Sequence, residues 1–306
     1  MTVSIRAALF VAYTAALLLG GADIVRALVD FSSRDSSASH LVVIPLIALG
    51  LLLQDRAKVF ASVHSAWVPG GAVIVAGLAG AVLALQGRPG PMSGLWLGVA
   101  SLATMWCGGF LAIFGRGAFA AARFPLAFLY FTAPIPAPVL DGAVEVLKTG
   151  STEMVAALFS LIGMTYHRQG YLFELSTLSI EVADACSGIR SSIALSLTAL
   201  LAGRNLLSRP WSRGLLLLAV LPVTIVKNAI RIVALSWLAI NVDPSFLSGR
   251  LHTDGGAAFF VLALALMVPV IVVLRRAERR RAKGGPADQT PTLPVPLQTA
   301  PRSDGA

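Results

Sequence analysis

Charged residues are scarce in this chain of 306 residues: Asp, Glu, Lys and Arg together make up 13%, whereas hydrophobic residues make up 56%. A soluble globular domain usually carries about 25% charged residues, so a soluble fold is excluded. Several windows of roughly 20 residues contain almost no charge, which is the length that an α-helix needs to cross a bilayer core. The composition therefore predicts a polytopic membrane protein.

Cysteine is also scarce, since the chain has two, and this excludes a disulfide framework. Cys107 falls near the middle of an apolar run, "LATMWCGGF", where we expect it to be a small packing residue. Cys186 lies in "IEVADACSGIRSSIAL", close to charged and glycine residues. The two cysteines are predicted to be half a membrane apart, so Cys186 is expected to be a free thiol.

A platform of interleaved basic and aromatic residues is missing too, which argues against nucleic-acid binding despite a net charge of +9. The positive charge gathers instead directly after the last apolar run, at Arg275, Arg276, Arg279, Arg280, Arg281 and Lys283. Such a cluster is typical of a cytoplasmic stop signal that contacts anionic lipids. The N-terminus shows no secretory cleavage pattern, and we expect Arg6 to precede a first span that is retained.

The apolar runs predict an all-α integral membrane protein with about eight transmembrane helices. These spans are Ala7–Val29, His40–Leu53, Trp67–Gln86, Leu95–Phe114, Pro125–Leu140, Ser187–Ala202, Leu215–Ile240 and Ala257–Leu274. Residues 1–275 form the predicted membrane domain, and residues 276–306 form a basic and then Pro/Gly-rich disordered tail.

The distribution of Lys and Arg predicts the orientation, because cytoplasmic loops carry an excess of both. With the N-terminus inside, the inner segments hold 14 of these residues and the outer segments hold six. Both termini are therefore predicted to lie in the cytoplasm.

Residues 141–185 are the one sizeable region predicted outside the spans, on the outer face. Apolar residues at helical spacing over 141–164 predict a helix on or in the membrane surface. Alternation in "YLFELSTLSIEV" then predicts a short strand or hairpin before the cysteine. An alternative interpretation makes Val155–Thr165 part of a ninth span, which would invert the downstream loops.

Three polar groups near the predicted outer face are candidates for chemistry. Arg231 lies in a span, where an arginine costs about 2.5–3.5 kcal/mol on insertion scales, and it shares a helical face with Lys227 and Asn228. His252, two residues before Asp254, lies at the mouth of the last span and has the ring of a proton shuttle.

Cys186 is the third group, at the predicted start of the sixth span. A helix N-terminus and a nearby cation, here Arg190, both lower a thiol's pKa and favour the thiolate. A thiol, a cation and an imidazole are the parts that acyl transfer at a peptide carbonyl requires. Taken singly, each also has an ordinary structural interpretation: packing, snorkelling or an exposed loop.

At these residues the chain resembles the exosortase/archaeosortase family of membrane cysteine transpeptidases. "ACSGIR", "NAIRI" and "HTDGG" are similar to the family's three motifs, and "RFPLAFLYFTAPIPAP" is similar to a proline-containing stretch upstream; together they lie within 123–274. The resemblance implies that Cys186 is the nucleophile, Arg231 the oxyanion or thiolate stabiliser and His252 the acid/base. Bulky residues commonly follow the arginine of the cysteine motif in this family, whereas Ser191 and Ser192 do here.

The resemblance further implies substrates that are membrane-tethered proteins ending in a Pro-Glu-Pro-like motif, a transmembrane helix and a basic cluster, cleaved at the outer face of the inner membrane. Exopolysaccharide machinery is an implied partner, and no cofactor or metal is expected. Arg190, Asn228 and Asp184 are predicted to position the substrate. A transporter that uses Arg231 and Lys227 in a polar cavity, or a non-catalytic scaffold for export, remains an alternative.

Overall fold

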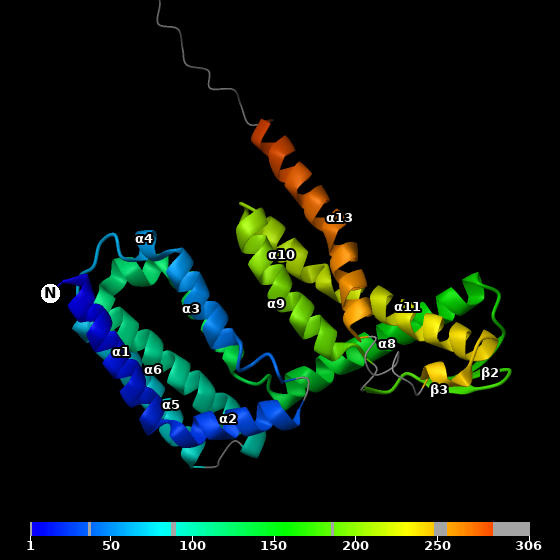
Figure 1. Cartoon of the computed structure of the whole chain (residues 1–306), viewed down its shortest axis with the longest axis horizontal. Helices are drawn as coiled ribbons and strands as arrows, with labels where there is room; N and C mark the ends of the chain where they lie inside the picture. Colours follow the sequence, from blue (N-terminus) through cyan, green and yellow to red (C-terminus); the bar gives the residue numbers. More distant parts are fainter. Residues whose placement is uncertain (1, 36–37, 87–89, 185–186, 248–255, 284–306) are drawn as a thin grey trace, which may run out of the picture.

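The computed structural model describes residues 2–35, 38–86, 90–184, 187–247 and 256–283. Its elements in chain order are α1 (Val3–Gly20), α2 (Ala22–Arg34), α3 (Ile44–Gln54), α4 (Arg56–Val59), α5 (Trp67–Leu85), α6 (Gly90–Ala121), α7 (Arg123–Leu129), η1 (Tyr130–Thr132), α8 (Ala137–Leu161), β1 (Tyr166–Gln169), β2 (Leu172–Leu175), β3 (Ser179–Glu181), α9 (Ile189–Leu206), α10 (Pro210–Leu218), α11 (Val220–Asn241), η3 (Pro244–Leu247) and α13 (Gly256–Lys283). The N-terminal helices gather at one end of the molecule and the small sheet lies at the other (Figure 1).

Long apolar helices confirm a multi-pass membrane protein. Five helices in the described part of the chain are long and apolar enough to cross a membrane: Val3–Gly20, Trp67–Leu85, Gly94–Ala121, Pro210–Asn241 and Gly256–Arg281. A sixth candidate joins Arg123–Thr132 to Ala137–Leu161 across an 88° bend. The length and hydropathy of these helices support five or six spans in the described part of the chain and do not confirm the predicted count of eight.

The predicted first span, Ala7–Val29, is instead two helices. α1 ends at Gly20, and the N–H of Gly21 still donates to the carbonyl of Leu17. α2 then turns away from the line of α1 (Figure 1). The physical reason is that Asp23 and Arg26, an exposed ion pair at 3.2 Å, fall in the outer part of the predicted span, where hydrocarbon would not solvate them.

Small residues allow α5 and α6 to pack closely. A Cβ on Gly70 would lie 2.5 Å from the backbone N of Ala112, and one on Gly77 would lie 2.9 Å from the backbone N of Met105. Close backbone approach through small residues is a common way for helices to associate in lipid, where apolar burial alone gives no driving force. Cys107 is buried on α6 in a cluster with Phe110 and Phe114, as predicted for a packing residue.

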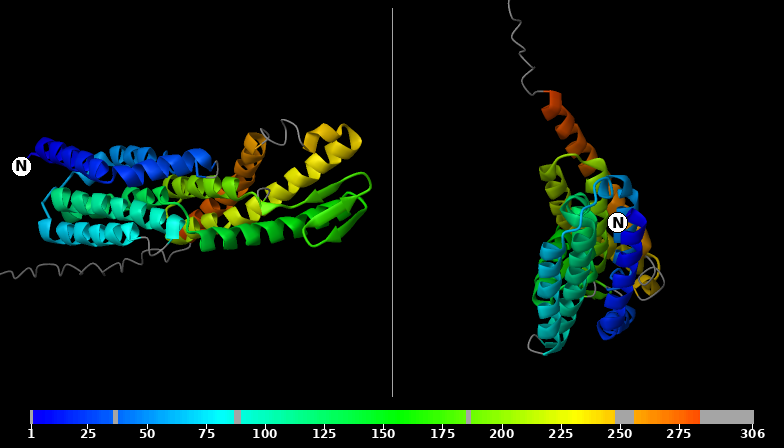
Figure 2. Two further views of the ribbon diagram at one scale, coloured as in Figure 1. Left: turned by 90° about the horizontal axis from the view of Figure 1, so that it is seen from below. Right: turned by 90° about the vertical axis from the view of Figure 1, so that its left-hand side faces the viewer.

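The region before the cysteine motif folds as a helix and a three-stranded antiparallel sheet. The structure confirms the predicted helix as α8, and confirms the predicted hairpin as β2 and β3; the edge strand β1 was not predicted. Phe173 and Val182 from the sheet segment are fully buried against Val155 and Phe159 of α8 and Ala229 of α11. α8 and α11 run together toward the sheet (Figure 2), so one apolar cluster joins all three.

The last helices form a second group. Leu195 and Ala199 of α9, Leu216 of α10, Val220 of α11 and Ala263 of α13 belong to one buried cluster. The three helices that carry or follow the predicted catalytic motifs are therefore packed against one another, close to the start of α8 (Figure 1).

Candidate active site

The structure describes some of the predicted site residues and not others. Cys186 and His252 lie outside the described residues. Arg231 is half-buried and Asn228 is fully buried on α11. Arg190 is exposed in the first turn of α9, and Asp184 precedes that helix. The structure thus brings together the helix that follows Cys186 and the helix that carries Arg231.

A sharp turn starts α9, two residues after Cys186. Gly188 is the N-cap, and its φ of +83° is a left-handed conformation that favours glycine. Its carbonyl accepts hydrogen bonds from the backbone N–H of Ser192, at 2.9 Å, and from Ser191 Oγ, at 2.8 Å. A Cβ at position 188 would meet the Asn228 and Thr224 side chains at 3.4 Å, so the turn lies directly against α11.

One face of α11 carries the polar groups that meet this turn. Thr224, Lys227, Asn228 and Arg231 have the spacing of neighbours on a helix surface. The first three are buried: Lys227 is 3% exposed and Asn228 is 0% exposed. Lys227 Nζ donates to Ser191 Oγ at 2.6 Å, and Asn228 Nδ2 donates to Ser151 Oγ of α8 at 3.1 Å. Polar contacts therefore join α11 to both α9 and α8.

Two hydroxyls at the same junction are buried and have no hydrogen-bond partner among the described residues. They are Ser187 Oγ, in the turn before α9, and Thr224 Oγ1, on α11. Buried polar atoms in native proteins are almost always paired. These two hydroxyls therefore leave hydrogen-bonding capacity unused at the start of α9, among the described residues.

An ion pair holds the segment that leads into the cysteine motif. Lys148 Nζ of α8 lies 2.9 Å from Asp184 Oδ1 and 4.2 Å from the centre of the Tyr171 ring. The Asp184 side chain is 73% exposed and that of Lys148 is 15% exposed. Asp184, predicted to position the substrate, thus has a structural partner that ties the chain to α8 two residues before Cys186.

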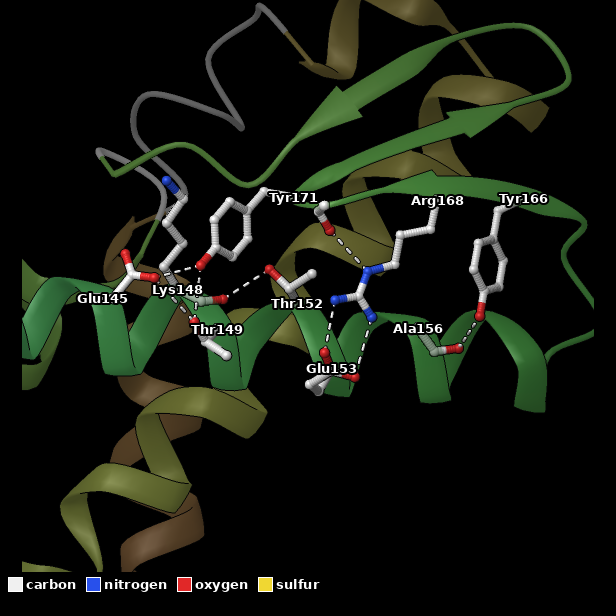
Figure 3. Close-up of polar contacts among 10 residues, drawn as sticks. Glu145, Lys148, Thr149, Thr152, Glu153, Ala156, Tyr166, Arg168 and Tyr171 are labelled. Carbon is white, nitrogen blue, oxygen red and sulfur yellow. Dashed lines mark hydrogen bonds and ion pairs between the residues drawn. The ribbon is translucent and has the colours of Figure 1, made fainter.

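Further polar contacts fasten the sheet to α8 (Figure 3). Arg168 of β1 donates to both carboxylate oxygens of Glu153, at 2.7 and 3.1 Å, and the Tyr171 hydroxyl donates to Glu145. The hydrogen bond to Glu153 raises the pKa of the Arg168 guanidinium above its usual value. A bidentate arginine–carboxylate pair fixes orientation as well as distance, so the sheet is held in one place above the helix.

A large apolar cavity of about 760 Å³ opens beside the start of α9. Its walls include Tyr130 and Pro134 from the segment before α8, Ile189 and Ser196 along α9, and Leu221 of α11. Ile189 is the first residue of α9, so one end of the cavity reaches the turn described above. Within the described ranges no group of three or more His, Cys, Asp and Glu side chains is arranged to hold a metal ion.

Three of these residues were not predicted to belong to a catalytic site. Lys148 is one of the six outer charges, and Ser191 was noted as a departure from the family pattern. Lys227 was named as a neighbour of Arg231 and in the alternative of a transporter. Two of them could have been suspected from their positions in the sequence, since Ser191 follows Arg190 directly and Lys227 is one helical turn before Arg231. Their pairing depends on how two helices pack and cannot be read from either segment alone.

Comparison with known proteins gives one family. The family model described as transmembrane exosortase (Exosortase_EpsH) matches residues 32–269, which is more than three quarters of the chain. No curated protein and no solved structure matches the chain. The matched range contains the turn before α9, the polar face of α11 and the start of α13.

Proposed function

We propose, since the chain belongs to the transmembrane exosortase family, that it is a membrane-embedded cysteine peptidase or transpeptidase. Its substrates are membrane-tethered proteins that end in a short Pro-Glu-Pro-like motif, a transmembrane helix and a basic cluster. It cleaves them near the motif, at the outer face of the inner membrane, and thereby releases or transfers the protein from its anchor.

The proposed reaction is acyl transfer. The Cys186 thiolate attacks the scissile carbonyl, and Arg231 stabilises the oxyanion that forms. His252 protonates the leaving amine as the C–N bond breaks, which leaves a thioester on Cys186. Water, a lipid amine or a sugar hydroxyl then attacks the thioester, and the thiol is restored.

One observation carries this proposal: the turn that follows Cys186 contacts the polar face of α11. A Cβ on Gly188 would lie 3.4 Å from Asn228, which is one helical turn before Arg231. Two buried hydroxyls without a described partner, Ser187 and Thr224, add hydrogen-bonding capacity at this point. Arg190, Asn228 and Asp184 are assigned to positioning.

The proposed topology has eight spans with both termini in the cytoplasm. Its support is the Lys and Arg asymmetry, together with α3, α7 and α9, which are shorter or less apolar than the five long helices but lie in apolar clusters with other helices of the chain. Residues 1–275 form the membrane domain, and residues 276–306 form a tail that contacts anionic lipids. Exopolysaccharide machinery is the proposed cellular partner, and nucleic acid is not.

The substrate's transmembrane helix docks from the side, into the 760 Å³ cavity beside α9. The cavity is lined mainly by apolar side chains, with the hydroxyls of Ser192 and Ser196 one turn apart on α9. An apolar helix that packs there has its outer end next to the turn that follows Cys186. Small and hydroxyl-bearing residues are common where helices meet in lipid.

The accumulation of uncleaved substrate in cells tests the proposal. In cells that express a substrate with a matching C-terminal signal, Cys186→Ala and Arg231→Ala are expected to abolish processing and His252→Ala to reduce it severely, so that full-length substrate accumulates on an immunoblot. Cys107→Ala, which removes the buried thiol of α6, is the matched control and is expected to process normally. Normal processing by Cys186→Ala would contradict the enzyme.

The same variants separate the alternatives. A transporter would tolerate Cys186→Ala but not Arg231→Ala, whereas a scaffold would tolerate both. Reaction with a membrane-impermeant thiol reagent, applied to intact spheroplasts, tests the orientation: labelling of Cys186 in the Cys107→Ala variant is expected from the outside.

A further inference from the structure

We propose that Lys227 and Ser191 form a positioning pair: the ammonium of Lys227, acting through the Ser191 hydroxyl, holds the turn at the start of α9 in the arrangement in which Cys186 reacts. The inference rests on the proposed function, and it adds two residues that lie just outside the motifs assigned to the reaction. Neither residue is proposed to touch the reacting atoms.

Two hydrogen bonds in series connect α11 to this turn. Lys227 Nζ donates to Ser191 Oγ at 2.6 Å, and Ser191 Oγ donates to the carbonyl of Gly188 at 2.8 Å. An ammonium has no lone pair and can only donate, so the hydroxyl must accept from Lys227 and give its own proton to Gly188. Each bond polarises the next in such a chain. The series ends on backbone two residues after Cys186.

The burial of Lys227 argues against a role in packing alone. The residue is 3% exposed within a candidate span and forms no ion pair with any described residue. Removing a charge from water without an opposite charge is costly, and an apolar residue of the same length would fill the space at no such cost. Ionisable residues inside membrane spans are most often functional for this reason.

The positions of the two residues fit a device that aligns helices. Ser191 is five residues after Cys186, and Lys227 is one turn before Arg231. Apolar contacts between α9 and α11 are non-directional, whereas a short hydrogen bond also fixes the direction in which its two groups face each other. The pair therefore fixes how α9, which follows Cys186, lies against α11, which carries Arg231, and a misplacement of about 1 Å in a catalytic site can cost about a hundredfold in rate.

The test uses the full chain in membranes, with Cys107→Ala as the background. The variants are Lys227→Met, Ser191→Ala, Ser191→Thr and the double variant. One readout is the rate at which a membrane-tethered reporter with a Pro-Glu-Pro motif, a transmembrane helix and a basic cluster is processed. The other is the rate at which iodoacetamide alkylates Cys186, which needs no substrate.

Lys227→Met and Ser191→Ala are each expected to slow processing by about ten- to hundredfold and to slow alkylation clearly. Ser191→Thr, which keeps the hydroxyl, is expected to process the reporter and to react with iodoacetamide at about the parental rates. The double variant is expected to process the reporter no more slowly than the slower of the two single variants, because the pair acts as a unit. Thr198→Ala removes a hydroxyl that is bonded within α9 at 2.8 Å, and Lys58→Met replaces an exposed lysine on α4. Both are matched controls and are expected to have no effect.

Processing and alkylation at the parental rates in Lys227→Met, or losses in the double variant that equal the product of the single losses, would overturn the positioning pair. If Cys186→Ala itself processes normally, the proposed enzyme fails, and the alkylation rates alone still decide whether the pair holds the turn. Should Lys227→Met not fold, as judged by gel filtration in detergent, Ser191→Ala against Ser191→Thr decides, because these two differ only in a small side chain.

Discussion

Among single residues, Gly188 is explained by its backbone conformation. Its φ of +83° lies in the left-handed region, which L side chains rarely adopt. A Cβ at this position would lie 3.4 Å from the Asn228 side chain, which is an ordinary van der Waals contact. The cost of another residue here is therefore conformational, at the point where α9 meets α11.

Gly188→Ala is expected to destabilise this turn by about 1–2 kcal/mol, the cost of a left-handed conformation for an L-residue. Processing of the reporter is expected to fall by at least about tenfold, since the cost falls on the segment that positions Cys186. Gly214→Ala on α10, where a Cβ meets nothing within 4 Å, is the control and is expected to be at least as stable as the parent. Equal processing by both variants would contradict the role of the turn.

Asp184 and Lys148 make a different prediction, because their contact is partly exposed. Exposed ion pairs contribute at most about 1 kcal/mol, so Asp184→Lys is expected to change the thermal midpoint little. It is expected to slow processing several-fold, because the chain before Cys186 loses its attachment to α8. The exchange variant Lys148→Asp/Asp184→Lys is expected to regain most of the rate; a double variant as slow as the single one would argue against the ion pair.

Among elements, α6 (Gly90–Ala121) is interrupted by a kink at Gly115 and continues as a helix beyond it. At Gly115 the backbone takes φ +86° and ψ 178°, a conformation essentially restricted to glycine. The carbonyls before the bend receive donors from other elements: Ala66 N–H donates to Ala112 at 2.9 Å, and the Arg6 guanidinium donates to Ile113. These contacts satisfy carbonyls that a break in a helix leaves unpaired. They also connect α6 to two other parts of the chain, namely α1 and the segment that precedes α5.

Gly115→Ala is expected to be strongly destabilising, by more than about 3 kcal/mol, since backbone strain is added to a steric clash. A Cβ at this position would lie 1.6 Å from the carbonyl oxygen of His64. The measurement is the thermal midpoint of the purified protein in detergent. Gly71→Ala, at an open position of α5, is the matched control and is expected to be neutral or stabilising; a similar midpoint for both variants would refute the argument.

For the molecule as a whole, long apolar runs predicted most helices, because a helix that crosses lipid needs such a run. Periodicity predicted α8 and the hairpin, whose apolar residues recur at the spacing of a helix and of a strand. Neither signal predicted the break at Gly21 or strand β1. In "YHRQ" only Tyr166 favours a strand, and the pairing with β2 creates the strand.

The site was predictable only in part, for a similar reason. Arg231 and Asn228 were identified because polar residues are conspicuous in an apolar helix. The partners of this face, Ser191 on α9 and Ser151 on α8, are hydroxyls on other helices. Serine is common in membrane helices, so nothing local distinguishes these two. The relation of Cys186 and His252 to that face stays a prediction.

The cavity beside α9 makes a prediction about substrate recognition by the whole protein. Ser196→Trp places a large side chain in the cavity and is expected to raise the KM for a membrane-tethered substrate by about tenfold or more, while kcat changes little. A short peptide that contains the motif but no transmembrane helix is expected to be cleaved as by the parent. Thr198→Trp, on the exposed face of the same helix, is the control; equal effects of both tryptophans would contradict lateral docking.

On the proposed function, the same cavity makes the lipid a competitor of the substrate. A volume of about 760 Å³ with mainly apolar walls is expected to be filled by acyl chains when no substrate helix is docked there. An arriving substrate helix would have to displace these chains, and the ease of that displacement depends on how ordered and how long they are. We therefore expect processing to depend on the physical state of the lipid, even when every residue near Arg231 is unchanged.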